Sequence, residues 1–256
     1  MEARRRFGSV ISFTYRKNIM REHVFIVGGS SGIGLATAEL LSGDRYQVTI
    51  ASRDQERLRS ASARLGDGVG TIVFDAADPD SIAAGFAAVS PIDHLVLALG
   101  SSKGGGDFSS VRMDQVRAGF EEKVFPHISC AQQALPFLAR SGSITFVSAV
   151  TAHAAMPGTA GLGAANAAIA ALVPTLAAEL RPLRVNGVSP GVIDTAWWDF
   201  LPDADKKAVH ASYAEKTPVG RVGTAYDIAQ TIEYLISCTF MNGRTLICDG
   251  GLSLLS

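Results

Sequence analysis

Short β-branched runs alternate with longer amphipathic stretches from His23 to the end of the chain. This alternation is typical of repeated strand–helix–strand units that build a parallel sheet. The runs predict strands at residues 24–27, 47–51, 71–74, 95–99, 143–147, 184–188 and 245–248. Right-handed crossovers would place the intervening alanine- and leucine-rich helices on both faces of the sheet. We therefore expect a single doubly wound α/β domain of the Rossmann type over residues 23–256, with a seven-stranded, mostly parallel sheet.

Residues 1–22 differ from the rest because basic residues greatly outnumber acidic ones. We expect a basic N-terminal tail here. It lacks the apolar core of a secretory signal, so it is either an organelle-targeting segment or a loose tail ahead of a start at Met20.

The composition of the 256-residue chain favours a small molecule as its partner. A net charge of -1 provides no basic face for nucleic acid or an acidic membrane surface. Cys130, Cys238 and Cys248 form no C-x-x-C pair, so we expect neither disulfides nor a metal site, and a cytoplasmic location. We expect no membrane span, because the most apolar helical runs carry the alanine and glycine of packed helices.

A glycine-rich segment follows the first predicted strand directly and opens a helix. Residues 27–34 are Val-Gly-Gly-Ser-Ser-Gly-Ile-Gly. Glycine lets backbone N–H groups and a helix N-terminus approach a pyrophosphate closely, although helix–strand packing alone also recruits glycine. The position between strand and helix predicts a nucleotide site. Its candidate contacts are Gly28, Ser30, Ser31, Gly32, Ile33 and Gly34.

The end of the second predicted strand indicates which nicotinamide cofactor would bind. An acidic residue there would bind the adenosine ribose of NAD(H), but Ser52 and Arg53 occupy this place. A hydroxyl followed by a guanidinium suits a 2′-phosphate, so we expect NADP(H) to be preferred over NAD(H). A one-residue shift in register would instead bring Asp54 to the ribose.

Several motifs in order resemble those of the short-chain dehydrogenase/reductase family from His23 onward. They are the glycine motif at 28–34, the stretch Arg-Val-Asn-Gly-Val-Ser-Pro-Gly-Val-Ile-Asp-Thr at 184–195, and the segments at 218–223, 227–229 and 249–251. The resemblance implies homo-oligomers that associate through helices beginning near Met113 and Gly161. It also implies further cofactor contacts by Asp75, Ala76, Ala98, Gly100, Pro190, Gly191, Ile193 and Thr195.

The resemblance fails at the family's catalytic residues, which are Asn, Ser, Tyr and Lys. Alignment by motif places Lys123 at the asparagine position, Ser148-Ala149 at the serine pair, Leu162 at the tyrosine position and Asn166 at the lysine position. No tyrosine occurs between the predicted fifth and sixth strands. A positioned acid is worth on the order of 100- to 10,000-fold in rate, so the usual proton chemistry is missing.

Several residues are candidates to replace it. Ser148, Thr151 and His153 follow the fifth predicted strand, and His153 is either a proton donor or a surface residue. Lys123 and Asn166 form either a swapped polar pair at the cofactor or an unrelated pair in which Lys123 extends into solvent. Pro126 predicts local distortion, because without an N–H it leaves the carbonyl of Glu122 without its helical partner.

The segment 196–201, Ala-Trp-Trp-Asp-Phe-Leu, predicts an apolar wall, either for a ring-containing substrate or for a subunit interface. Tyr213 beyond it is either a residue that reaches the substrate or an ordinary helical residue. Three functions remain open: an NADP(H)-dependent oxidoreductase with a non-standard active site, a catalytically silent NADP(H)-binding protein, and a lyase or isomerase that uses the same crevice.

Overall fold

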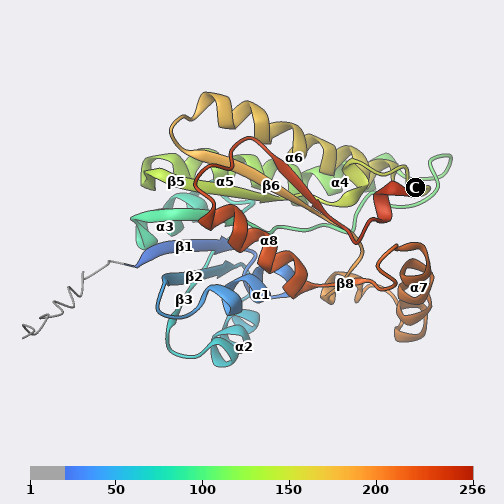
Figure 1. The fold of residues 1–256 in the computed structure, drawn as a ribbon, viewed down its shortest axis with the longest axis horizontal. Coiled ribbons are helices and arrows are strands. Elements are labelled where there is room, and N and C mark those ends of the chain that lie inside the picture. The colour runs from blue at the N-terminus through green and yellow to red at the C-terminus, as the bar shows by residue number, and fades with distance from the viewer. Residues whose placement is uncertain (1–20, 256) are drawn as a thin grey trace, which may run out of the picture.

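The computed structural model describes residues 21–255 and shows the expected doubly wound sheet (Figure 1). Seven parallel strands lie in the order β3-β2-β1-β4-β5-β6-β9, and a separate two-stranded sheet pairs β7 with β8. The strands are β1 (Glu22–Val27), β2 (Tyr46–Ser52), β3 (Val69–Val73), β4 (Ile92–Leu97), β5 (Leu138–Val147), β6 (Arg184–Pro190), β7 (Ile193–Asp194), β8 (Gly223–Thr224) and β9 (Thr245–Cys248). The predicted fold class is confirmed.

Helices cover both faces of the sheet. They are α1 (Gly32–Leu41), α2 (Gln55–Leu65), α3 (Pro79–Val89), α4 (Met113–Gly119), the π-helical η1 (Phe120–Val124), α5 (Phe125–Ala134), α6 (Ala160–Glu179), α7 (Asp203–Lys216) and α8 (Ala225–Ser237). Alternate residues of β1 supply the two cores, because successive side chains of a strand point to opposite faces. Phe25 packs on the face with Phe86 and Ile169, whereas Ile26 packs on the face with Ile232.

Some predicted boundaries need correction. Strand β5 begins at Leu138 rather than at 143, because residues 138–142 include exposed polar positions that give no strand pattern. Strand β4 is shifted toward the N-terminus, to 92–97, and β3 lies at 69–73. The helix expected near Met113 is interrupted by η1, which ends two residues before Pro126, where the sequence predicts a local distortion. The tail at residues 1–20 lies outside the described residues.

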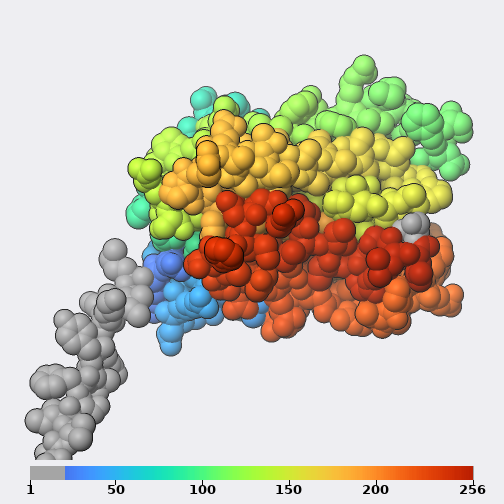
Figure 2. Space-filling model, turned by 45° about the horizontal axis from the view of Figure 1, so that its top comes forward, coloured from blue at the N-terminus to red at the C-terminus, as the bar shows by residue number. Residues whose placement is uncertain are grey.

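Helix α6 corrects the expectation about apolar stretches. It is 20 residues long, and its length and composition suffice to cross a membrane, although only 33% of its most apolar window is buried here. A core helix can pass the same test. Its inner face, with Ile169 and Val173, belongs to the main core, and its outer face adjoins the C-terminal segment on one continuous surface (Figure 2).

Candidate active site

The turn after β1 brings bare backbone against other parts of the chain. Gly28 has a φ of 84° and Gly32 a φ of 51°, both in the left-handed region that favours glycine. A Cβ atom on Gly28 would stand 2.6 Å from the carbonyl oxygen of Ala98, and one on Gly34 would stand 2.2 Å from the carbonyl oxygen of Gly28. The tight approach leaves room for glycine alone, which is the cradle that a pyrophosphate requires.

The first turn of α1 is open to an anion. Ser31 is the N-cap residue, but its side chain caps no backbone N–H group, and the first turn holds no acidic residue. Ser30, Ser31 and Ile33 are half-buried. The positive end of the helix dipole therefore remains available for a phosphate.

Two sets of residues at the end of β2 are candidates to contact an adenosine ribose: Ser52 with Arg53, or Asp54. Asp54 is the N-cap residue of α2, where one carboxylate oxygen accepts hydrogen bonds from the N–H groups of Glu56 at 3.0 Å and Arg57 at 3.1 Å. This carboxylate is engaged by its own helix. Ser52 is half-buried, and Arg53 is exposed, with a guanidinium that pairs with no other residue in 21–255.

The predicted adenine and nicotinamide contacts lie at the same carboxyl edge of the sheet. Asp75 and Ala76 follow β3, and Asp75 accepts a hydrogen bond from the N–H of Ala77 at 3.0 Å. Thr195 follows β7 and lies against Gly32, since a Cβ atom there would stand 3.5 Å from the Cβ of Thr195. The pyrophosphate turn and the segment after β6 therefore meet.

The turn at Pro190 and Gly191 is supported from behind by β9. The N–H of Gly191 donates to the carbonyl of Cys248 at 3.0 Å, and a Cβ atom on Gly191 would stand 2.7 Å from the Cα of Asp249. Ile193 then pairs with Gly223 in the small β7–β8 sheet. The strand order therefore fixes the predicted contacts Pro190, Gly191 and Ile193 in one place.

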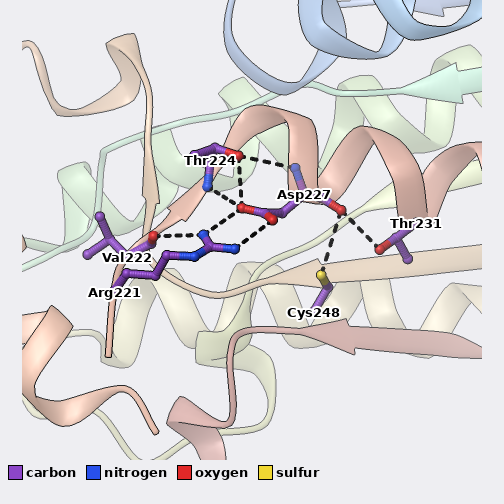
Figure 3. Close-up of polar contacts among 6 residues, drawn as sticks. All are labelled: Arg221, Val222, Thr224, Asp227, Thr231 and Cys248. Atoms are coloured by element: carbon purple, nitrogen blue, oxygen red, sulfur yellow. Dashed lines mark hydrogen bonds and ion pairs between the residues drawn. The ribbon is translucent and has the colours of Figure 1, made fainter. Parts of the chain in front are cut away.

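Residues of the segment 218–229 form polar contacts that hold the start of α8 (Figure 3). Asp227 forms a capping box with Thr224 at the start of α8 and a two-bond ion pair with Arg221, both contacts measuring 2.8 Å. The Arg221 guanidinium holds the pKa of the Asp227 carboxyl well below its usual range. A cavity of about 190 Å³ adjoins this pair and the thiol of Cys248.

Helix α6 carries the residues that stand at the tyrosine and lysine positions. Leu162 is half-buried and apolar, so it can neither donate nor accept a proton. Asn166 is 4% exposed and donates from Nδ2 to the Oγ1 of Thr151 at 3.0 Å and to the carbonyl of Leu162 at 2.9 Å. At the two positions that the motif alignment assigns to the tyrosine and the lysine, the structure thus has a hydrocarbon side chain and an amide.

Lys123 points inward, so the alternative in which it extends into solvent is wrong. It is 8% exposed, and its Nζ donates to the carbonyl of Ser148 at 3.2 Å. The π-turn that contains it ends beside Pro126, where the missing N–H prevents an ordinary α-helical bond. Burial lowers the pKa of Lys123 to about 8, so the side chain is mainly an ammonium at neutral pH.

His127 supports Lys123 from one turn further along, and it was not anticipated from the sequence. The ring is 0% exposed, with Nδ1 2.7 Å from the carbonyl oxygen of Lys123 and Nε2 3.1 Å from the carbonyl oxygen of Leu97. Burial and the nearby ammonium of Lys123 lower the pKa of His127 to about 4. The ring is neutral at pH 7, so only one of the two contacts is a donated hydrogen bond. A histidine inside a helix gives no sequence signal for this role.

The other predicted polar residues lie apart from this cluster or turn away from it. Ser148 is 4% exposed, and its hydroxyl donates to the carbonyl of Val188 at 3.3 Å. His153 is exposed and makes no side-chain hydrogen bond within residues 21–255. Tyr213 is half-buried in α7, with the ammonium of Lys216 5.5 Å from its ring centroid.

Aromatic residues join two loops over the carboxyl end of the sheet. The Nε1 of Trp197 donates to the carbonyl of Ser101 at 3.1 Å, and the hydroxyl of Ser101 donates to Glu122 at 2.6 Å. Trp198 and Phe200 pack against Trp197 at ring-centroid distances of 4.7 and 5.4 Å. The loop after β4, which contains Ala98 and Gly100, is thereby tied to the segment after β7. Ser101 and Glu122 were missed in the sequence, because no motif marks them.

A hollow of about 500 Å³ opens beside the start of α6. Thr151, the partner of Asn166, reaches its wall, and apolar side chains dominate the remainder. The lining includes Phe108, Ala154, Met156 and Pro157. Among residues 21–255 no cluster of three or more metal-ligating side chains occurs.

Comparison with known proteins agrees with this geometry. Residues 27–253 match the family model described as enoyl-(acyl carrier protein) reductase. The chain therefore belongs to the short-chain dehydrogenase/reductase family of oxidoreductases.

Individual relatives extend the similarity over nearly the whole chain. The chain is 28% identical to the short-chain dehydrogenase/reductase ucsE of Acremonium sp, over 89% of this chain and 94% of that one. It is 27% identical to carbonyl reductase family member 4 of Xenopus tropicalis, over 90% and 97%. A small-chain dehydrogenase solved in complex with NADPH superposes with a TM-score of 0.81 at 28% identity, over 92% of this chain and 100% of that one.

Proposed function

We propose that this protein is an NADP(H)-dependent oxidoreductase with a non-standard active site. The observation that carries the cofactor preference is the end of β2, where the Asp54 carboxylate caps α2 while Ser52 and Arg53 are left for a 2′-phosphate. A guanidinium gives such a phosphate planar, charge-assisted donors. The NADPH complex of the similar small-chain dehydrogenase supports the same reading.

Residues at both ends of the crevice support this assignment. The glycine turn at 28–34 and the uncapped start of α1 suit the pyrophosphate, and Asp75 and Ala76 lie where the adenine would rest. At the opposite end, Pro190, Gly191, Ile193 and Thr195 would border the nicotinamide. When bound, the cofactor would supply or accept the hydride.

We propose a small apolar or ring-containing carbonyl compound or alcohol as substrate. Trp197 and Phe200 are partly exposed at the carboxyl edge, and the hollow beside α6 is largely apolar. Such walls favour a ligand that buries hydrocarbon and presents few polar groups.

The absence of the tyrosine keeps one other function in view. A protein that binds NADP(H) without turning over a substrate fits Leu162, because this side chain leaves the alkoxide of a reduced ketone without a proton donor. The two functions differ in an optical assay: a working reductase oxidises NADPH when a carbonyl compound is added, and a silent protein does not.

Binding of NADPH and NADH to the unmodified protein and to Arg53→Ala tests the cofactor assignment. Loss of one charge-assisted interaction should lower the NADPH affinity roughly 10- to 100-fold and leave the NADH affinity nearly unchanged. Arg59→Ala, in α2, is the control, because Arg59 pairs with Glu56. An unchanged NADPH to NADH ratio in Arg53→Ala would show that the assignment is wrong.

We further propose that the chain forms homo-oligomers through the outer faces of α4, α5 and α6. Met113, Phe125 and Ile128 are 60%, 49% and 39% exposed, which is unusual for large apolar side chains on neighbouring helices. A second copy of this chain would cover the same apolar stripe symmetrically. Light scattering on Phe125→Glu would detect the expected loss of mass.

A further inference from the structure

Helix α7 adds little to the hydrophobic interior. None of its 14 residues is buried, and none belongs to either core of residues 21–255. The helix lies beyond the carboxyl ends of the strands, beside the β7–β8 sheet (Figure 1). A doubly wound fold binds its ligand at this edge, so α7 stands at the mouth of the crevice, and apolar burial contributes little to holding it there.

The face of α7 that turns toward the protein is largely polar. Its half-buried residues are Lys206, Val209, His210, Tyr213 and Ala214, while the rest of the helix is exposed. Residues three and four apart share one side of a helix, so these five form a single face. The two apolar members are small, and the position of the helix therefore depends on its polar contacts.

One carboxylate collects those contacts. Asp194 Oδ1 lies 3.7 Å from Lys206 Nζ and 3.8 Å from His210 Nδ1. Lys206 Nζ also donates a hydrogen bond to Asp199 at 3.1 Å, and this bond raises the pKa of Lys206. The Lys206 ammonium therefore bridges two carboxylates of the segment that precedes the helix.

Trp198 completes the cluster. Its ring meets the His210 ring edge to face, with centroids 5.5 Å apart, and its Nε1 donates to the carbonyl of Ile193 at 3.0 Å. Among residues 21–255, no other side chain of α7 forms an ion pair, a side-chain hydrogen bond or a ring contact with the remainder of the chain. Lys206 and His210 thus carry the polar attachment of α7.

The C-terminal end of α7 has an anchor of its own. Thr217 follows the helix, is 6% exposed, and donates from its hydroxyl to the carbonyl of Tyr213 at 2.7 Å. Lys206 and His210 lie in the first half of the helix, which begins after the exposed Pro202. The ionic cluster is therefore what holds this first half, whereas the second half is fixed at Thr217.

We propose that α7 is a strap across the mouth of the crevice and that the Asp194–Lys206–Asp199 ion bridge is the latch that holds it closed. The side chains of Asp194 and Asp199 are 57% and 64% exposed, so salt screens the latch and opens the strap. Asp194 directly precedes Thr195, which lies against the glycine turn, so opening the latch frees the cofactor end of the crevice. The role in ligand exchange rests on the proposed function, in which the ligand is NADP(H).

A measurement without ligand tests the latch itself. The chain has two tryptophans, so Trp197→Phe leaves Trp198, which contacts His210, as the only indole. Acrylamide is uncharged and should quench Trp198 more strongly when the strap is open. In this background, Lys206→Met should raise the quenching at low salt to the value that the Lys206 protein reaches at high salt.

Two matched variants separate the charge of Lys206 from a general effect on the helix. Lys206→Arg keeps the charge and should keep the low quenching. Lys207→Met removes the same charge from the next position, which is exposed and forms no ion pair within residues 21–255, and should also keep it. Thermal melting of each variant shows that the data come from folded protein.

Stopped-flow mixing with NADPH tests the consequence for ligand exchange. A latch that is closed in both the free and the bound protein slows entry and exit alike. Lys206→Met should therefore raise the association and dissociation rate constants by the same factor, roughly 2- to 10-fold, and leave the Kd unchanged. The difference from the unmodified protein should shrink as salt is added, and Lys207→Met should show none.

Each result decides the proposal. Unchanged quenching in Lys206→Met at low salt would overturn the latch. Raised quenching with unchanged NADPH rate constants, or a changed Kd with only one rate constant altered, would overturn its control of ligand exchange. If NADPH does not bind the unmodified protein, the proposed function and the role in NADP(H) exchange fail together, whereas the quenching experiment still decides the latch.

Discussion

Replacing Lys123 with methionine should make the ligand-free protein more stable. Methionine has a similar length and needs no hydration, so it removes the buried charge and retains the packing. A pKa lowered from 10.5 to about 8 corresponds to about 3 kcal/mol of destabilisation of the charged form by folding. Loss of the hydrogen bond to Ser148 offsets about 1 kcal/mol of the gain. The net increase is about 2 kcal/mol at pH 7.

The pH dependence identifies the cause. Below pH 8 both folded and unfolded states keep the Lys123 proton, so the destabilisation is complete. Between about pH 8 and pH 10.5 the folded state releases it while the unfolded state retains it, so the stability of the unmodified protein rises. The advantage of Lys123→Met therefore shrinks across this window and disappears near its upper end.

Urea and thermal denaturation, both followed by tryptophan fluorescence at several pH values, measure both effects. At pH 7 the melting temperature should rise by about 4 to 8 °C for a domain of this size. Lys207→Met, at an exposed position, should change the stability little at any pH. A less stable Lys123→Met variant at pH 7, or a difference independent of pH, would refute the reasoning.

Three other outcomes follow from the geometry. Gly34→Ala should abolish measurable NADPH binding in a titration, because its Cβ would stand 2.2 Å from the carbonyl oxygen of Gly28. The control Gly68→Ala should retain NADPH binding, because a Cβ at Gly68 meets no atom within 4 Å. The unmodified protein should lose stability as the pH falls from 6.5 to about 4, because folding opposes protonation of the buried His127 ring in this range. His127→Gln should reduce this loss, which acid denaturation curves would measure. Asp227→Asn should cost about 1 kcal/mol through the weakened capping box and ion pair. Thermal melts below pH 3.8 should show a smaller difference, because the unfolded state then binds a proton at Asp227 that the folded state still excludes.

The fold followed from the sequence because its signals are local and repeated. Each strand of the sheet is a β-branched run that recurs before an amphipathic segment, and the glycine turn at Gly28 fixes the first crossover. The extent of β5 could not be predicted, since its first residues pair only with β4 and include exposed polar positions that alternate poorly. Helix α6 contains an apolar stretch of membrane length that was not anticipated from the sequence, and its inner face packs in the main core.

Residues of the candidate site could be predicted only where the residue type and its place relative to a predicted strand or helix both indicated a role. Lys123 was located by counting along the helix, and Pro126 indicated the distortion that turns it inward. His127 was not predicted, because its role depends on two carbonyl groups brought together from η1 and β4. The engagement of Asp54 by α2 likewise depends on a capping geometry that the sequence alone leaves open.

The bond between Trp197 and the Ser101 carbonyl bears on how fast ligands enter and leave. It joins the loop after β4 to the segment after β7, and so spans the carboxyl end of β5, where Ser148 lies. The two loops cannot separate without breaking this hydrogen bond. Separation of the two loops therefore has to move the Trp197 indole, so its fluorescence would report that motion directly.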